Sequence, residues 1–225
     1  ESYYVAYEHW KTVVRALPNN GAAWVGFGGC LLRANLPDSA ERALQRARRF
    51  VPDALGLRYN ECCLWAITGD FDRLAEAVQS FDIGELAQAL AWFGREMDLF
   101  GEFMDDAALR RLCLAFLTGS TSVDGGDDPL PTSTDGPRIE AWARLVRALR
   151  DRLLRAVRMV HVTEWDEAAM ELTTAVESGL THPQVRLALA FSMYKQGRAG
   201  EALGVLARAA REFPERTELA AHYVS

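Results

Sequence analysis

The chain carries small and apolar residues that return at a fixed interval of 34 residues. In three separate series this spacing holds through four copies and, after a break, through two more. The series are Ala6, Ala40, Leu74, Ala108, Ala168 and Ala202; Trp10, Leu44, Val78, Leu112, Leu172 and Leu206; and Val13, Ala47, Phe81, Ala115, Ala175 and Ala209. A period of this length is typical of stacked helix pairs that bury their apolar faces against one another. The pattern therefore predicts an all-α fold, an α-solenoid of antiparallel helix hairpins.

The break in the period predicts one insertion within a single domain spanning residues 1–225. Ala108 and Ala168 are 60 residues apart, which is one period plus 26 residues. The segment 118–137 is rich in Gly, Ser, Thr, Asp and Pro, so we expect a flexible loop there. Residues 138–161 have no helix breaker and predict one long helix. The expected order is hairpins in 1–122, the insertion at about 118–137, the long helix and further hairpins in 138–216, and a terminal helix in 215–225.

The clearest copy covers residues 22–52 and matches a known repeat pattern in both of its predicted helices. The first helix fits W-x2-L-G-x2-Y, with Phe for Leu and Leu for Tyr, and the second fits A-x3-F followed by a closing Pro. The matching residues are Trp24, Phe27, Gly28, Leu31, Ala40, Leu44 and Pro52. On these residues the chain resembles the tetratricopeptide repeat family. The resemblance implies a right-handed superhelix whose first helices line a concave surface where partners bind.

The residue types in this copy also have a physical reason. Gly28 and Ala40 are small, as close crossing of two helices requires, and Trp24 and Leu44 fill the space beside them. Pro52 ends the second helix. A later copy departs from the pattern, because Glu96 stands where a small residue is expected, and we expect distortion there.

Composition narrows the classes of partner and compartment. The net charge is −6 and the arginines are scattered, so nucleic acid is not expected as a partner. No apolar run approaches the roughly 20 residues of a membrane span. The four cysteines lack the density of a disulfide framework, which favours a reducing, cytoplasmic compartment. The chain opens at Glu1 inside a predicted helix, so we expect it to be part of a longer protein.

The sequence contains no recognisable catalytic, metal or cofactor motif, and none of these is predicted. The run Gly26-Phe27-Gly28-Gly29 lacks the third spaced glycine and the preceding strand of a dinucleotide site. The four histidines lie far apart in sequence. The neighbours Cys62 and Cys63 point different ways on a helix and are interpreted as buried apolar residues rather than a redox pair.

The family resemblance places a set of mostly apolar and aromatic residues on the concave surface. Such a surface suits an amphipathic helix or an extended hydrophobic peptide, and it lacks the Lys, Arg and Asn set of a carboxylate clamp. The alternative is that the surface is filled from within the molecule. The candidate partner-binding residues are Val25, Leu32, Tyr59, Cys63, Ile67, Phe93, Met97, Phe100, Leu153, Val157, Val160, Phe191, Tyr194 and Lys195.

Three functions follow from these expectations. The first is a protein–protein interaction module, an adaptor or assembly scaffold without chemistry of its own. The second is a secretion chaperone, because residues 23–30 and 61–64 resemble the class II chaperones of bacterial type III secretion. The third is a ligand-sensing regulatory domain of a larger protein. Self-association into a homo-oligomer is compatible with all three.

Overall fold

The computed structural model describes residues 2–102, 104–122, 129–130, 138–214 and 216. Within this part of the chain every regular element is an α-helix, and no strand is present. The helices are α1 (Ser2–Ala16), α2 (Gly21–Arg33), α3 (Pro37–Arg48), α4 (Leu55–Thr68), α5 (Phe71–Gln79), α6 (Ile83–Phe100), α7 (Asp106–Thr118), α8 (Arg138–His161), α9 (Trp165–Glu177), α10 (Pro183–Lys195) and α11 (Ala199–Glu212). The predicted all-α fold is confirmed.

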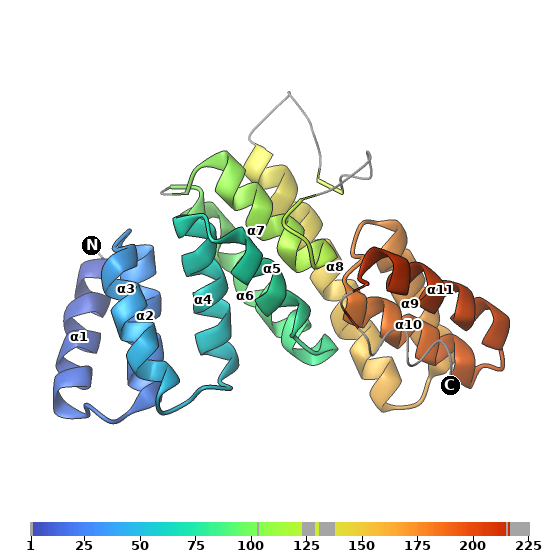
Figure 1. Cartoon of the computed structure of the whole chain (residues 1–225), viewed down its shortest axis with the longest axis horizontal. Helices are drawn as coiled ribbons and strands as arrows, with labels where there is room; N and C mark the ends of the chain where they lie inside the picture. The colour runs from blue at the N-terminus through green and yellow to red at the C-terminus, as the bar shows by residue number, and fades with distance from the viewer. Residues whose placement is uncertain (1, 103, 123–128, 131–137, 215, 217–225) are drawn as a thin grey trace. The chain divides into compact units, whose positions relative to one another are not determined.

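The chain folds into two compact units, and the division falls within α5, α6 and α7. Unit 1 comprises Glu1–Ala77 and Glu96–Leu112, and unit 2 comprises Val78–Arg95 and Cys113–Ser225. In unit 1, α1 packs on α2, α2 on α3, and both α2 and α3 on α4. In unit 2, α8 packs on α9, α9 on α10, and α10 on α11 (Figure 1). Neighbouring helices therefore pack in sequence order, whereas one continuous 1–225 domain stays a prediction.

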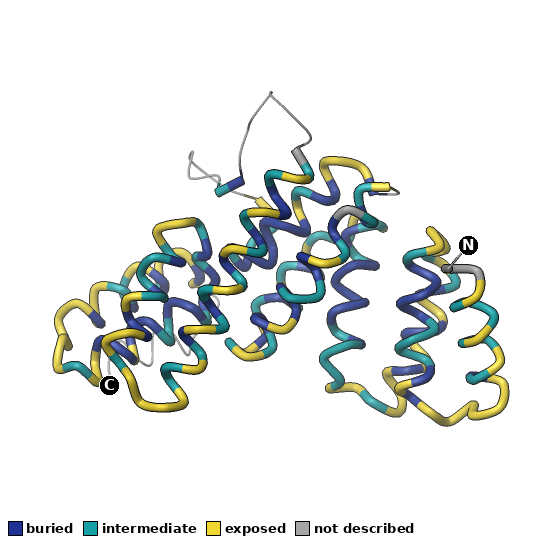
Figure 2. The backbone as a smooth tube through the Cα atoms, turned by 180° about the vertical axis from the view of Figure 1, so that it is seen from behind, coloured by how far each residue is buried: buried dark blue, intermediate teal, exposed yellow. Residues whose placement is uncertain are grey.

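The residues that repeat at the 34-residue interval form the core of both units. From Ala40 onward every member of the three series is buried, and in the first copy Ala6, Trp10 and Val13 are half-buried. Figure 2 shows the corresponding pattern, with buried and exposed stretches alternating along the helices and exposed residues at many of the turns. The period thus marks the positions at which each helix contacts its neighbours.

Three glycines of α2 allow three other helices to approach it closely. A Cβ at Gly26 would lie 2.6 Å from the Trp10 ring of α1, and one at Gly28 would lie 2.5 Å from Leu44 Cδ2 of α3. A Cβ at Gly29 would lie 3.0 Å from Asn60 Nδ2 of α4. Helix packing therefore accounts for the run Gly26-Phe27-Gly28-Gly29, and the predicted close crossing at Gly28 is confirmed.

Local signals in the sequence set the helix ends. The Asn20 side chain accepts a hydrogen bond from the Ala23 N–H at 3.0 Å and caps α2. Gly69 ends α4 with φ +80°, a left-handed conformation that glycine adopts without steric cost. The predicted long helix is confirmed as α8, with the predicted bounds. Most of the predicted insertion and the terminal helix at 215–225 lie outside the described residues.

Candidate functional site

Half of the fourteen predicted partner-binding residues lie in the core. Each has an exposed fraction of 2% or less, so none offers a surface to a partner in this conformation. These residues are Leu32, Tyr59, Cys63, Met97 and Phe100 in unit 1, and Phe93 and Leu153 in unit 2. For these seven side chains, the arrangement agrees with the alternative of a surface filled from within.

The other half divides into partly covered and exposed side chains. Val25, Ile67, Val157 and Val160 are half-buried. Phe191 and Tyr194 are 48% and 62% exposed, and Lys195 is also exposed. The accessible part of the predicted surface is therefore concentrated on α10.

Unit 1 contains a polar cluster that the sequence pattern did not reveal. Arg33 of α2 forms an ion pair with Glu96 of α6, and its Nη1 donates a hydrogen bond to the Gly29 carbonyl at 2.6 Å. The Tyr59 hydroxyl of α4 donates to the other Glu96 carboxylate oxygen at 2.9 Å. The side chains of Arg33 and Glu96 are 19% and 25% exposed. Glu96, which departs from the repeat pattern, thus joins three helices.

The protonation states in this cluster favour a structural role. Burial raises the pKa of Tyr59 well above its usual value, so the hydroxyl stays protonated and donates. Burial lowers the pKa of Arg33, but its hydrogen bond and charge interaction with Glu96 outweigh that effect and raise it. The neutral phenol and the charged guanidinium both stabilise the Glu96 carboxylate. We assign this cluster to helix packing.

The cysteines are buried thiols, consistent with the interpretation of Cys62 and Cys63 as packing residues. Burial raises the pKa of Cys63 to about 12 and that of Cys62 well above its usual value. Because the thiolate is the reactive form, neither residue is suited to nucleophilic or redox chemistry near neutral pH.

His182 is a fully buried imidazole at the start of α10. Its Nε2 donates to the Val78 carbonyl at 3.0 Å, and its Nδ1 accepts from the Gln184 N–H at 3.2 Å. Burial lowers the pKa of His182 to about 4, partly opposed by the Val78 hydrogen bond, and the Arg216 charge lowers it further. The imidazole is therefore neutral at physiological pH and caps the helix.

Three exposed residues of α10, Phe191, Tyr194 and Lys195, and the half-buried Trp165 of α9 form what we call the aromatic surface. The rings of Trp165 and Phe191 meet edge to face, with centroids 5.5 Å apart and planes at 85°. The Lys195 ammonium lies 5.1 Å from the centre of the Phe191 ring. The Gln196 side chain donates to the Trp165 carbonyl at 2.6 Å and joins the start of α9 to the end of α10. The aromatic surface thus combines the Trp165–Phe191 ring pair with the exposed Tyr194 ring and one cation.

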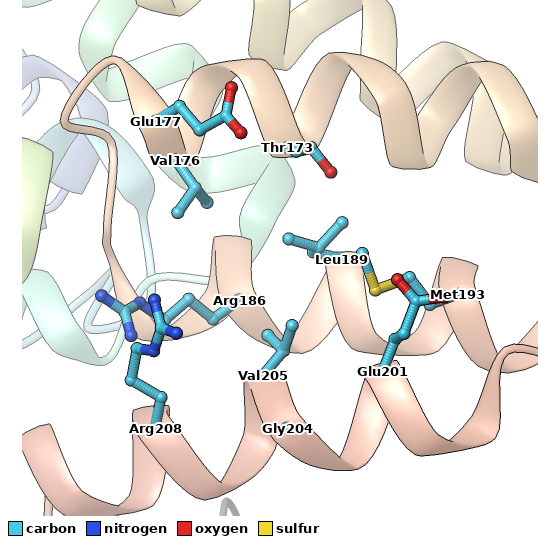
Figure 3. A pocket seen from close by; sticks show the side chains of 10 residues that line it. All are labelled: Thr173, Val176, Glu177, Arg186, Leu189, Met193, Glu201, Gly204, Val205 and Arg208. Carbon is cyan, nitrogen blue, oxygen red and sulfur yellow. The ribbon is translucent and has the colours of Figure 1, made fainter.

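A separate pocket of about 380 Å³ lies among α9, α10 and α11 (Figure 3). Helix α9 forms one wall and α11 the other, with residues of α10 between them. Mostly apolar side chains and Thr173 occupy the middle, while Arg186, Arg208 and Glu177 lie toward one end and Glu201 at the other. The lining residues are Thr173, Val176, Glu177, Arg186, Leu189, Met193, Glu201, Gly204, Val205 and Arg208. The sequence pattern did not predict this pocket.

Among the described residues, no group of His, Cys, Asp and Glu side chains could hold a metal ion. None of the described helices is both long enough and apolar enough to cross a bilayer. Comparison with protein-family models and with curated proteins finds no match to this chain. The aromatic surface and the pocket are therefore the candidate functional sites in the described part of the chain.

Proposed function

We propose that the protein is a non-catalytic protein–protein interaction module, an adaptor or scaffold that binds a partner segment on the aromatic surface. In this proposal the helices form a right-handed solenoid of the tetratricopeptide type. Support comes from helices that pack in sequence order and from the burial of the residues that repeat at the 34-residue interval. Arrays of this kind use their side-chain surface, rather than a catalytic pocket, for function.

The observation that carries the proposal is the exposure of Phe191 and Tyr194 at 48% and 62%. Aromatic side chains dominate the energetics of protein interfaces because each one buries a large area at a small conformational cost. Phe191 is already held by Trp165 and Lys195. A partner would therefore find a preorganised anchor and lose little side-chain entropy on binding.

The chemistry of the aromatic surface defines the partner segment. Apolar or aromatic side chains would cover Phe191 and Tyr194, and an acidic side chain would pair with Lys195. A short helix or extended peptide with such residues suits this surface. The secretion-chaperone alternative instead needs an extended apolar groove in the first hairpins, where Leu32, Tyr59 and Cys63 are buried.

Selection from a random peptide library on the immobilised protein tests the proposal. We expect enriched peptides to combine apolar or aromatic residues with an acidic one, and to bind the double variant Phe191→Ala and Tyr194→Ala at least tenfold more weakly. The matched control is Leu36→Ala and Phe50→Ala, which removes an aliphatic and an aromatic side chain that are 46% and 42% exposed in unit 1. Equal binding to the wild type and to the Phe191/Tyr194 variant would contradict the proposal.

A further inference from the structure

We propose that the pocket among α9, α10 and α11 binds a small aliphatic carboxylic acid. Its carboxylate would contact Arg186 and Arg208, and its hydrocarbon chain would lie along the apolar middle of the pocket. This inference is independent of the proposed function, because the pocket contains none of the four residues of the aromatic surface.

The shape of the pocket suits a short chain with one polar end. Its volume of about 380 Å³ lies within the range of small-molecule sites, near the lower limit. Residues 186 to 193 of α10 span about 10 Å, the extended length of roughly six to eight methylene groups. Along this length the lining is mostly apolar, with Val176 from α9, Leu189 and Met193 from α10, and Val205 from α11, and Thr173 of α9 adds one hydroxyl (Figure 3).

Arg186 is a buried cation whose position is fixed by the protein. Its side chain is only 7% exposed. Its Nε donates to the Thr181 carbonyl at 3.2 Å, and its two Nη atoms lie 3.0 and 2.7 Å from the two oxygens of Glu212. These contacts engage one hydrogen on each nitrogen of a group with five N–H donors, so each Nη retains a second hydrogen. Arg186 can therefore donate to a ligand without releasing Glu212.

Arg208 adds a second positive charge at the same end of the pocket (Figure 3). The structure records no ion pair or hydrogen bond of its guanidinium with any residue in the described part of the chain. Glu212 pairs with Arg186, whereas Glu177, toward the same end on α9, forms no ion pair with Arg208 within the described residues. The end of the pocket therefore combines one fixed and one available guanidinium, which is the arrangement that binds carboxylates through charge-assisted hydrogen bonds.

The two acidic residues that line the pocket help to distinguish an anionic ligand from a cationic one. Glu201 is at the opposite end, where Arg198 neutralises it at 2.7 Å. Glu177 lies on the α9 wall and forms no ion pair within the described residues. Its charge opposes a bound carboxylate, so removing that charge is expected to strengthen binding. A cationic ligand would respond to the same change in the opposite way.

Methyl NMR titration with octanoate provides the test, with octylammonium and octan-1-ol as probes of charge. We expect octanoate to bind with a Kd of about 0.1–1 mM and to shift the methyl signals of Val176, Leu189 and Val205. The two comparison compounds should bind at least fivefold more weakly. Equal binding of octylammonium and octanoate would overturn the proposal, as would the absence of saturable shifts.

Four single substitutions locate the site. Arg208→Gln should weaken octanoate binding about tenfold, and Glu177→Gln should strengthen it two- to threefold. Gly204→Leu should abolish binding without unfolding the protein, because a Cβ at Gly204 would meet no atom within 4 Å. Gly200→Leu is the matched control, since it lies on α11 with the same free space but outside the pocket lining. Unchanged binding by Gly204→Leu, or equal loss in both glycine variants, would overturn the proposal.

Discussion

Phe191 of α10 packs edge to face against Trp165 of α9, with ring centroids 5.5 Å apart, while almost half of the Phe191 side chain stays exposed. The partly covered Trp165 fixes the position of the exposed ring. A ring held in this way differs from an exposed apolar side chain that changes rotamer freely. Fixed, exposed aromatic rings are typical of interface anchors, and this pair is the basis of the proposed interaction surface.

The double substitution Tyr59→Glu and Phe93→Glu is expected to unfold the protein. The two side chains are 2% and 0% exposed, so each substitution would bury a carboxylate without a prepared partner. We expect the cooperative thermal transition followed by circular dichroism to disappear. A variant that kept the wild-type melting temperature would show that these positions are open to solvent.

Removing the cation of the unit 1 polar cluster should leave the Glu96 carboxyl group without its ion-pair partner and poorly solvated. Arg33→Met is therefore expected to lower the free energy of unfolding by about 2–4 kcal/mol, and Tyr59→Phe by about 1 kcal/mol. Urea denaturation measures both effects. Arg198→Met, which breaks the exposed pair with Glu201, is the control and should cause no measurable loss. Equal stability of Arg33→Met and wild type would contradict the structural role of the cluster.

His182 predicts a pH dependence of stability between about pH 6.5 and 4. The folded-state pKa is lowered to about 4 from an ordinary value of 6.5, so the unfolded state binds a proton first as the pH falls. The stabilisation is fully present above about pH 6.5 and decreases toward pH 4, by about 3 kcal/mol in total. Urea denaturation across this range should show the decrease in wild type and in the exposed-site control His161→Gln.

The variant His182→Gln tests whether His182 is the responsible group. It should be less stable than wild type at pH 7.5, because it loses the buried contacts to the Val78 carbonyl and the Gln184 N–H. Its stability should also change much less between pH 6.5 and 4.5. A variant that retained the full pH dependence would assign the effect to another group.

The close crossing of α2 and α3 should not tolerate a larger residue. A Cβ at Gly28 would lie 2.5 Å from Leu44 Cδ2, so Gly28→Leu requires the helices to separate. We expect a loss of about 3 kcal/mol or more in the free energy of unfolding, measured by urea denaturation. Gly200→Leu, where the added Cβ meets open space, should retain wild-type stability or exceed it. Similar losses in both variants would show that the effect does not come from the close crossing of α2 and α3.

The sequence predicted the helices and the core because both depend on periodic residue types. Ala40, Leu44 and Ala47 repeat at the helical spacing that places them against neighbouring helices, and all three are buried. The repeat pattern predicted that Glu96 would distort its copy. That pattern contains no information about the Arg33 and Tyr59 side chains, which pair with Glu96 in the structure. Such pairing depends on residues 37 and 63 positions away.

The functional surface was predictable only in part. The repeat pattern indicates which helix face a residue occupies, but not how deeply neighbouring helices cover it, so Met97 and Tyr194 received the same prediction. The pocket was missed because it depends on three helices meeting around a residue without a side chain, Gly204. A glycine inside a predicted helix, one turn before an arginine as Gly204 is before Arg208, is the sequence signal that could have indicated it.

Photo-crosslinking of a selected peptide tests the proposed interaction surface most directly. A benzoylphenylalanine placed at position 194 would report binding at the aromatic surface, and the same group at position 50 would report non-specific contact with an exposed aromatic position. We expect a crosslinked product at position 194 that unlabelled peptide competes away, and none at position 50. Equal yields at both positions, or no product at position 194 under saturating peptide, would contradict it.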